Sequence, residues 1–168
     1  MTPDSDTRTD LVNAGKKALD LLARREHSTF EIVEKLRARG FSDEIISVVV
    51  EDLQNRNYLS DRRFAETFVE QRLRKGRGER SIRADLNRRG INAEDTREAL
   101  VNHASAWSDL AISTLLRKIP DGFELPEDRS EAYRLKAKYS RFLQSRGFST
   151  EQIKTALAAL PREKTGIE

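Results

Sequence analysis

The sequence predicts an all-α protein, an elongated tandem array of three three-helix repeats. Two observations carry this prediction. The composition favours helices, because Ala, Leu, Glu and Arg dominate, while the 168 residues include only 4 prolines and 8 glycines. In addition, the pattern Leu-x-x-Arg-Gly-apolar-capping residue occurs three times along the chain, ending at Ser42, Asn92 and Ser149.

Each position of this repeated pattern has a role at the end of one helix and the start of the next. The glycine suits the left-handed conformation that ends a helix, and the leucine and the apolar residue make the contact of a Schellman motif. The last residue of the pattern is a good N-cap for the following helix. The three copies, Leu36–Ser42, Leu86–Asn92 and Leu143–Ser149, therefore predict three helix–turn–helix units.

A further helix in front of each unit completes a three-helix repeat. We expect these helices near residues 11–26, 61–75 and 107–118, and repeats that span 11–59, 60–105 and 106–161. Residues 1–10 have no apolar pattern to bury and are expected to be a disordered tail, and 162–168 form a second tail. Because units of this size bury little surface alone, each should lean on its neighbours in an elongated molecule.

The first repeat shows the expected elements most clearly. Its first helix should bury Ala18, Leu19, Leu22 and Ala23. Its second helix should start after Ser28, which has a capping-box spacing to Glu31. Its third helix should run from Ser42 to about Asn55 and bury Ile45, Ile46, Val49, Val50 and Leu53.

Composition excludes several classes of protein. The chain has no cysteine, which excludes a disulfide scaffold and cysteine-based metal sites or nucleophiles. No apolar run approaches the roughly 20 residues that span a membrane, and the first ten residues are too polar for a secretory signal. We therefore expect a cytoplasmic protein that does not act at a membrane.

Catalytic patterns are missing from the sequence. The only two histidines, His27 and His103, fall in different repeats without metal-site spacing, so both should be structural or exposed. The glycines of Lys75–Gly78 could let a backbone approach a phosphate, but their spacing fits no phosphate-loop fingerprint, and a hinge between helices is the better interpretation. We expect no cofactor and no enzymatic activity.

Positive charge is concentrated in the middle of the chain. The net charge is only +3, with 31 basic and 28 acidic residues, yet residues 72–89 carry eight basic side chains against Glu79 and Asp85. Such a run could be a solvated face, could meet an acidic protein surface or could contact nucleic-acid phosphates, and its density favours binding. The candidate partner-binding residues are Arg72, Arg74, Lys75, Arg77, Arg80, Arg83 and Arg88.

Two of these arginines have local alternatives. Arg72 falls on the same helical face as Phe64 and Phe68, so it either covers the core edge or pairs with a carboxylate, or else lines a groove between helices. Arg74 has the i,i+4 spacing of an ion pair with Glu70. Aromatic residues are sparse, so any DNA contact should be electrostatic and independent of base sequence.

Three motifs in this order resemble the RecX family of bacterial recombination regulators. They lie in Ala18–Ser28, Tyr58–Ala65 and Lys75–Ile91, and the resemblance extends over about residues 14–160. It implies a cytoplasmic, non-enzymatic modulator of the RecA recombinase, built from three-helix repeats, that acts on RecA–single-stranded DNA filaments. Such proteins dampen filament growth, ATP hydrolysis, strand exchange and the coprotease role of RecA in the SOS response. The loop at 120–127 departs most from the family pattern.

The expected partner is therefore the RecA filament. DNA, single-stranded or double-stranded, is a further candidate partner without sequence specificity, and we expect a monomer. Two other functions stay open at this point. One is a helix-turn-helix repressor that binds DNA directly, although its third helices look too apolar to read bases. The other is a helical adaptor for a different protein.

Overall fold

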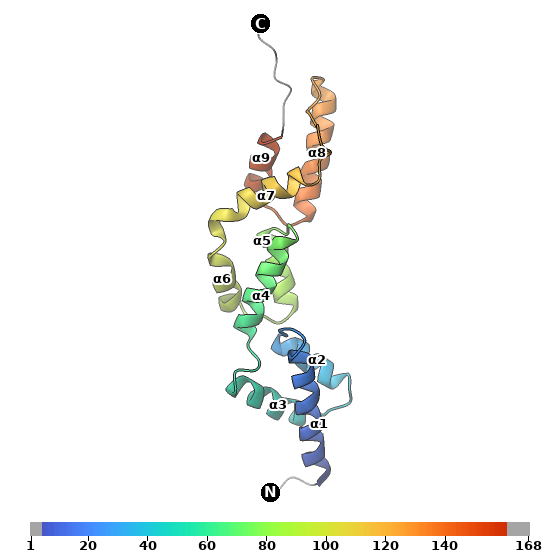
Figure 1. The fold of residues 1–168 in the computed structure, drawn as a ribbon, viewed down its shortest axis with the longest axis vertical. Coiled ribbons are helices and arrows are strands. Elements are labelled where there is room, and N and C mark those ends of the chain that lie inside the picture. The colour runs from blue at the N-terminus through green and yellow to red at the C-terminus, as the bar shows by residue number, and fades with distance from the viewer. Residues whose placement is uncertain (1–4, 161–168) are drawn as a thin grey trace. The chain divides into compact units, whose positions relative to one another are not determined.

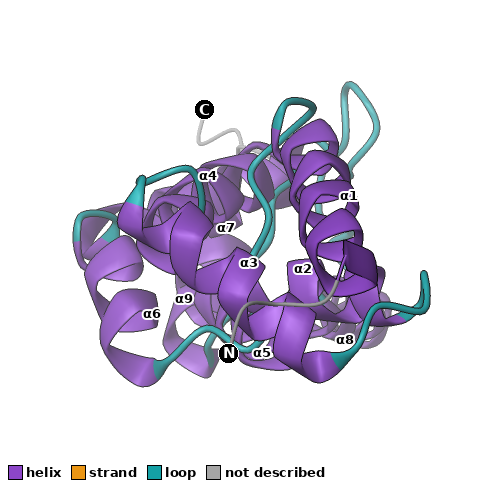
Figure 2. Ribbon diagram, turned by 90° about the horizontal axis from the view of Figure 1, so that it is seen from below, coloured by secondary structure: helices purple, strands orange, loops and turns teal. Residues whose placement is uncertain are grey.

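The computed structural model describes residues 5–160. The secondary-structure elements of these residues are all helices (Figures 1 and 2). The first repeat contains α1 Ser5–Leu22, α2 Thr29–Arg37 and α3 Asp43–Asn55; the second contains α4 Asp61–Arg74, α5 Glu79–Arg88 and α6 Ala93–Val101; the third contains the 3₁₀ turn η1 Ala104–Ala106, α7 Trp107–Leu116, α8 Arg129–Ser145 and α9 Thr150–Ala158. This order confirms the all-α class and the three three-helix repeats. The elongated arrangement and the repeat boundaries stay predictions. Within residues 5–160, no helix has the length and apolar character to cross a membrane.

Residue contacts divide the chain into two compact units, and all three points of division fall inside the middle repeat. Unit 1 contains residues 1–68 and 86–99, and unit 2 contains residues 69–85 and 100–168. The divisions cut α4, α5 and α6, so the middle repeat contributes residues to both units.

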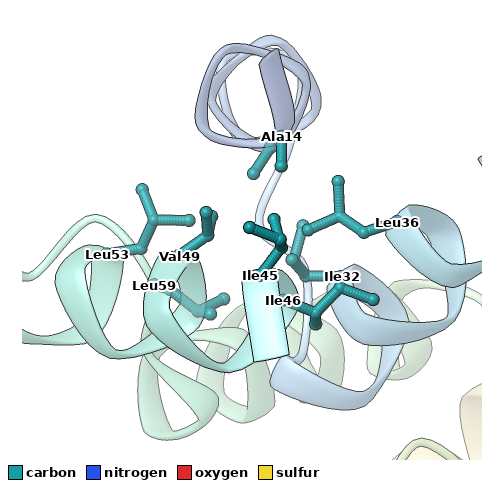
Figure 3. Packing of buried hydrophobic residues seen from close by; sticks show 9 residues of the cluster. Ala14, Ile32, Leu36, Ile45, Ile46, Val49, Leu53 and Leu59 are labelled. Atoms are coloured by element: carbon teal, nitrogen blue, oxygen red, sulfur yellow. The ribbon is translucent and has the colours of Figure 1, made fainter. Parts of the chain in front are cut away.

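The core of unit 1 lies where α1 packs on α2 and α3. Its buried residues are Ala14, Ala18, Ile32, Leu36, Ile45, Ile46, Val49, Leu53 and Leu59. Figure 3 shows the apolar side chains of α2 and α3 gathered on the side of α1 that carries Ala14. The expected stripe on α3 is confirmed, except that Val50 is only half-buried.

Two expectations for the first helix were wrong. The helix begins at Ser5, so residues 5–10 are helical and not a disordered tail; residues 1–4 and the predicted tail at 162–168 lie outside the described part of the chain. Because side chains 6–10 are exposed, this part of the helix has no apolar periodicity from which a helix could be predicted. Asp6, in the first turn, interacts favourably with the positive end of the helix dipole.

The buried face of α1 also differs from the expected one. Ala14 and Ala18 are fully buried, whereas Leu19 is 43% exposed and Ala23 lies beyond the helix end and is exposed. Positions four residues apart share a helical face, which places Ala14, Ala18 and Leu22 together. Leu19, one residue on from Ala18, is turned by about 100° from that face.

The three predicted helix-ending turns are confirmed. Gly40, Gly90 and Gly147 have φ values of +88°, +75° and +89°. The N–H after each glycine donates to the leucine carbonyl that begins the pattern: Phe41 to Leu36 (3.4 Å), Ile91 to Leu86 (3.1 Å) and Phe148 to Leu143 (3.3 Å). This is the hydrogen bond that defines a Schellman motif.

The predicted helix starts are confirmed as well. Ser42, Asn92 and Ser149 each accept a hydrogen bond from the backbone N–H three residues later. A reciprocal capping box forms at Ser149 with Gln152. At Ser28 the hydroxyl caps α2, but the Glu31 carboxylate is turned to other partners, so only half of that box forms.

Unit 2 has its own core, in which α7 packs on α8 and α9. Its buried residues are Ala111, Leu115, Leu125, Tyr139, Leu143, Phe148, Ile153, Ala156 and Leu160. The loop before α8 contributes Leu125 and also Phe123, whose ring meets Tyr139 edge-on with 5.8 Å between centroids. Asp128 caps the long helix α8, because its side chain accepts a hydrogen bond from the backbone N–H of Glu131.

Candidate polyanion-binding surface

The Arg-Gly turn of the second repeat packs on the second helix of the first repeat. This contact lies within unit 1. Arg89 pairs with the Glu31 carboxylate at the start of α2, and its guanidinium lies 5.1 Å from the centre of the Phe68 ring. A Cβ on Gly90 would lie 2.8 Å from the Cβ of Phe30. The glycine therefore permits close contact with α2 in addition to ending its own helix.

The Arg-Gly turn of the third repeat docks in the same way on α5, and this contact lies within unit 2. The N–H of Gly78 donates to the Arg146 carbonyl (2.8 Å), and the N–H of Arg80 donates to the Gly147 carbonyl (3.1 Å). The first N–H groups of a helix have no partner inside it. Carbonyls of the third repeat thus satisfy the N-terminus of a second-repeat helix.

The Lys75–Gly78 segment, for which the sequence favours a hinge between helices, follows the end of α4 and contacts two other elements. Gly76 has a φ of +65°, and the N–H of Arg77 donates to the Arg72 carbonyl (3.0 Å), which again is a Schellman bond. A Cβ on Gly76 would lie 2.7 Å from Thr114 Oγ1. The segment is therefore held against α7 on one side and against the Arg146–Gly147 turn on the other.

Arg146 connects this segment to α8. Its Nη1 donates to the Lys75 carbonyl at 2.8 Å, and its guanidinium lies 5.0 Å from the centre of the Phe142 ring. The ammonium of Lys118 lies 5.7 Å from the same ring centre. Two cations, one following α7 and the other following α8, thus share one aromatic ring, an arrangement stabilised by the negative face of the ring.

These residues surround an open pocket of about 170 Å³. Its lining residues are Arg74, Lys75, Thr114, Arg117, Lys118, Phe142 and Arg146. The lining includes five cationic side chains and no carboxylate. Lys75, Arg117, Lys118 and Arg146 form no ion pair with any carboxylate of residues 5–160. We call this set of seven residues the basic pocket.

The sequence-predicted basic residues have different environments. Arg72 is 24% exposed and lies 3.5 Å from Asp85, which confirms the interpretation that it pairs with a carboxylate. Arg83 pairs with Glu79 at 2.7 Å. The expected pair of Arg74 with Glu70 is present at 3.6 Å, and both of its side chains are highly exposed.

The other candidates divide as follows. Lys75 and Arg74 line the basic pocket. Arg77 and Arg80 follow in the chain and form no ion pair with a described carboxylate. Arg88 belongs to unit 1, whereas the other six candidates belong to unit 2. The structure therefore brings together only part of the predicted set.

Sequence reasoning missed three cations of the basic pocket, namely Arg117, Lys118 and Arg146. Arg146 did carry a signal, because it holds the same position in the repeated pattern as Arg89, which docks on the preceding repeat. Arg117 and Lys118 follow the last turn of α7, where basic residues are common. Nothing in their local sequence distinguishes them.

The two histidines differ in burial, since His27 is buried and His103 is half-buried. His27 is 3% exposed, and its Nδ1 lies 3.1 Å from the Arg25 carbonyl oxygen. Burial lowers the pKa of His27, and it outweighs the opposing effect of that hydrogen bond. Among residues 5–160, no three acidic or histidine side chains are grouped as metal ligands.

Comparison with known proteins gives a consistent result along the chain. Residues 14–53, 60–100 and 126–157 match the family models of the first, second and third three-helix domains of RecX. The chain is 40% identical over 141 residues to the regulatory protein RecX of Chromohalobacter salexigens, a match that covers 84% of this chain and 88% of that protein. It is 39% identical over 148 residues to the regulatory protein RecX of Pseudomonas fluorescens, covering 88% and 92% of the two chains.

Solved structures show the same fold. A crystal structure of a regulatory protein RecX matches with a TM-score of 0.75 and 21% identity, covering 90% of this chain and 74% of that one. The crystal structure of RecX from Lactobacillus salivarius matches with a TM-score of 0.74 and 21% identity, covering 90% and 96%. Together with the family models, these matches confirm the resemblance identified from the three sequence motifs.

Proposed function

The chain belongs to the RecX family of regulatory proteins, and on that premise we propose that it binds the RecA–single-stranded DNA filament and inhibits RecA. The inhibited activities are filament extension, ATP hydrolysis, strand exchange and the coprotease activity. In this way the protein modulates DNA repair and the SOS response. It acts in the cytoplasm as a monomer and has no catalytic activity of its own.

The observation that best supports this proposal is the set of cations in unit 2 without a carboxylate partner. Lys75, Arg77 and Arg80 lie on or next to the fixed helix end at Gly76 and form no ion pair with a described carboxylate. A nucleoprotein filament offers DNA phosphates and acidic side chains to such groups. Because the backbone that carries them is held by α7 and by the Arg146–Gly147 turn, little conformational freedom of this segment is lost on binding.

The existing ion pairs rank the candidate contacts. The exposed pair of Arg74 with Glu70 is of a kind that contributes about 0–1 kcal/mol, so Arg74 exchanges partners readily. Arg72 is largely buried beside Asp85 and gives up that partner only at a cost. We propose primary contacts from Arg74, Lys75, Arg77 and Arg80, and secondary ones from Arg72, Arg83 and Arg88.

A RecA ATPase assay on single-stranded DNA tests the proposal. Titration with the wild-type protein should inhibit ATP hydrolysis, and a variant with Arg74, Lys75, Arg77 and Arg80 changed to Glu should not bind the filament. A matched control changes four exposed basic residues of unit 2 away from the pocket, Arg129, Arg134, Lys138 and Lys154, to Glu. Circular dichroism checks that both variants keep the helicity of the wild type. No effect of the wild-type protein on RecA would remove the proposed function.

Acidic residues at the starts of the third helices disfavour the alternative function, a helix-turn-helix repressor. A recognition helix presents its N-terminal residues to base edges in the major groove. The corresponding third helices here start with acidic residues, which DNA phosphates repel: Asp43 and Glu44 in α3, Glu94 and Asp95 in α6, and Glu151 in α9. Sequence-specific binding to duplex DNA without RecA would revive this candidate, and indifference to both RecA and DNA would favour a helical adaptor for another protein.

A further inference from the structure

We propose that the basic pocket of unit 2 binds a phosphate group of a single-stranded nucleic-acid backbone. The pocket combines residues of the second repeat, Arg74 and Lys75, with residues of the third repeat, Arg117, Lys118 and Arg146. The inference rests on the proposed function and deepens it, because it assigns the DNA component of the filament to a defined site that includes third-repeat residues.

The charges that line the basic pocket are all positive. Five cationic side chains line a pocket of about 170 Å³, and no carboxylate is among the lining residues. Charges within one Debye length, about 8–10 Å at moderate salt, act on one another. The like charges repel each other in the free protein, and an anion in the pocket relieves that repulsion.

Part of the pocket is held in place by contacts within the protein. The hydrogen bond from Arg146 to the Lys75 carbonyl and the contact with Phe142 hold one guanidinium in place. Lys118 is held over the same ring. Gly76 lies directly against Thr114, so the backbone that carries Lys75 is fixed as well. Cations that are already ordered lose less side-chain entropy when they bind a ligand.

The hydrogen-bond donors of the pocket favour phosphate as the bound anion. Three of the five cations are arginines, whose planar guanidinium groups donate paired hydrogen bonds to phosphate oxygens. A phosphate group offers more acceptor oxygens than a carboxylate and can therefore engage several of these donors together. The volume of the pocket is many times the about 10–15 Å³ that a single water needs, so it has room for a whole phosphate group.

Basic residues beyond the pocket favour a polymer as the source of the phosphate. Arg77 and Arg80 continue the positive charge along the chain beyond the pocket, and neither has a carboxylate partner in the described residues. The phosphates next to the bound one in a strand can meet these side chains. Phe142 interacts with Lys118 and Arg146 and is the one aromatic residue that lines the pocket, so the pocket offers few rings for bases to stack on. Binding should accordingly be independent of base sequence.

The test measures binding of the full-length protein to a fluorescently labelled single-stranded oligodeoxynucleotide by anisotropy, without RecA. Changing Arg117 and Lys118 to Gln should weaken binding about tenfold or more, because charge-assisted hydrogen bonds to one phosphate are lost. The slope of log affinity against log salt should fall by about 0.7 for each lost phosphate contact. The matched control, R134Q/K138Q, removes the same charge from exposed sites on α8 outside the pocket and should weaken binding much less.

Two results would overturn the inference. Equal losses in R117Q/K118Q and in R134Q/K138Q would mean that only net charge matters. An oligoglutamate peptide that competes with the oligonucleotide, where inorganic pyrophosphate does not, would identify the pocket as a site for acidic protein segments. Pyrophosphate competition that R117Q/K118Q abolishes supports the inference.

Failure of the phosphate pocket and failure of the proposed function give different results. Inhibition of RecA that persists in R117Q/K118Q, together with unchanged DNA binding, overturns the phosphate pocket alone. DNA binding through the pocket without any effect on RecA overturns the proposed function alone.

Discussion

Gly147 packs directly on Ser81: a Cβ on the glycine would lie 2.4 Å from the backbone nitrogen of the serine. The same glycine has a φ of +89° and ends α8. One residue therefore ends a helix and also allows that helix to dock on the preceding repeat. Gly40, in the first repeat, has a similar φ of +88° but no atom within 4 Å of its would-be Cβ. It has only the first of these two roles.

This difference predicts unequal effects of the same substitution. G40A should lower the free energy of unfolding by about 1–2 kcal/mol, the cost of a left-handed conformation for a residue with a Cβ. G147A adds the clash with Ser81, so we expect a loss of roughly 3 kcal/mol or more, since overpacking alone costs about 1–3 kcal/mol. Urea unfolding of both variants measures the difference. Equal losses of unfolding free energy in the two variants would show that the contact between Gly147 and Ser81 accommodates a Cβ without destabilising the protein.

Arg146 should stabilise unit 2 in addition to lining the basic pocket. R146Q removes the hydrogen bond to the Lys75 carbonyl and the contact with Phe142, and should cost about 1–2 kcal/mol of unfolding free energy. R117Q, at an exposed position with no ion pair to a described carboxylate, should change stability by less than about 0.5 kcal/mol. Thermal or urea unfolding compares the two. If R146Q and R117Q both changed the unfolding free energy by a similarly small amount, the contacts of Arg146 would not stabilise unit 2.

The elements were predictable from the sequence because their signals are local. Helix ends and starts depend on residues within one turn, so the three glycines and the caps at Ser42, Asn92 and Ser149 could be identified without a structure. The basic pocket was not predictable. Its members come from α4, α7 and α8 and meet only because one repeat docks on another. Long-range contacts of this kind leave no periodic pattern in the chain.

The third repeat shows the same limit. In the first and second repeats the second helices, α2 and α5, have 9 and 10 residues, and a following Arg-Gly turn packs near their N-termini. In the third repeat α8 has 17 residues. Counted back from the turn glycine, the position of Ser81 corresponds to Lys138, which lies inside α8, where backbone N–H groups already have partners. In α8, therefore, no helix N-terminus lies at the position where the Arg-Gly turns pack on α2 and α5.

His27 should make the stability of unit 1 depend on pH. Burial lowers its pKa below the usual value of 6.5, so the folded state binds the proton less readily than the unfolded state does. Below pH 6.5, His27 binds a proton in the unfolded chain but stays neutral in the folded protein until the pH reaches its lower folded-state pKa. Stability should therefore fall as the pH drops from about 6.5 to the lower pKa of the folded state, and level off beyond it.

The variant H27N tests this dependence, because its amide can still donate to the Arg25 carbonyl but does not titrate. Urea unfolding between pH 5 and pH 8 should show a smaller slope of stability against pH for H27N than for the wild type. The exposed carboxylates contribute equally to both proteins and cancel in the comparison. Identical slopes would mean that His27 binds its proton equally well in the folded and unfolded states.

Glu31 is the acidic residue on which the docking of the second repeat on α2 depends. Its side chain is only 11% exposed and pairs with Arg89 from the docked turn and with Arg25 at 2.9 Å. E31Q should lower the free energy of unfolding by about 1–3 kcal/mol, less than for a fully buried pair because both arginines keep contact with water. E34Q is the matched control, since Glu34 pairs with Arg37 on the exposed face of the same helix. This variant should cost less than about 0.5 kcal/mol.

A double-mutant cycle of E31Q with R89Q measures the coupling energy of the Glu31–Arg89 pair alone. A coupling energy near zero would show that the packing of Gly90 on Phe30 holds the turn without this pair.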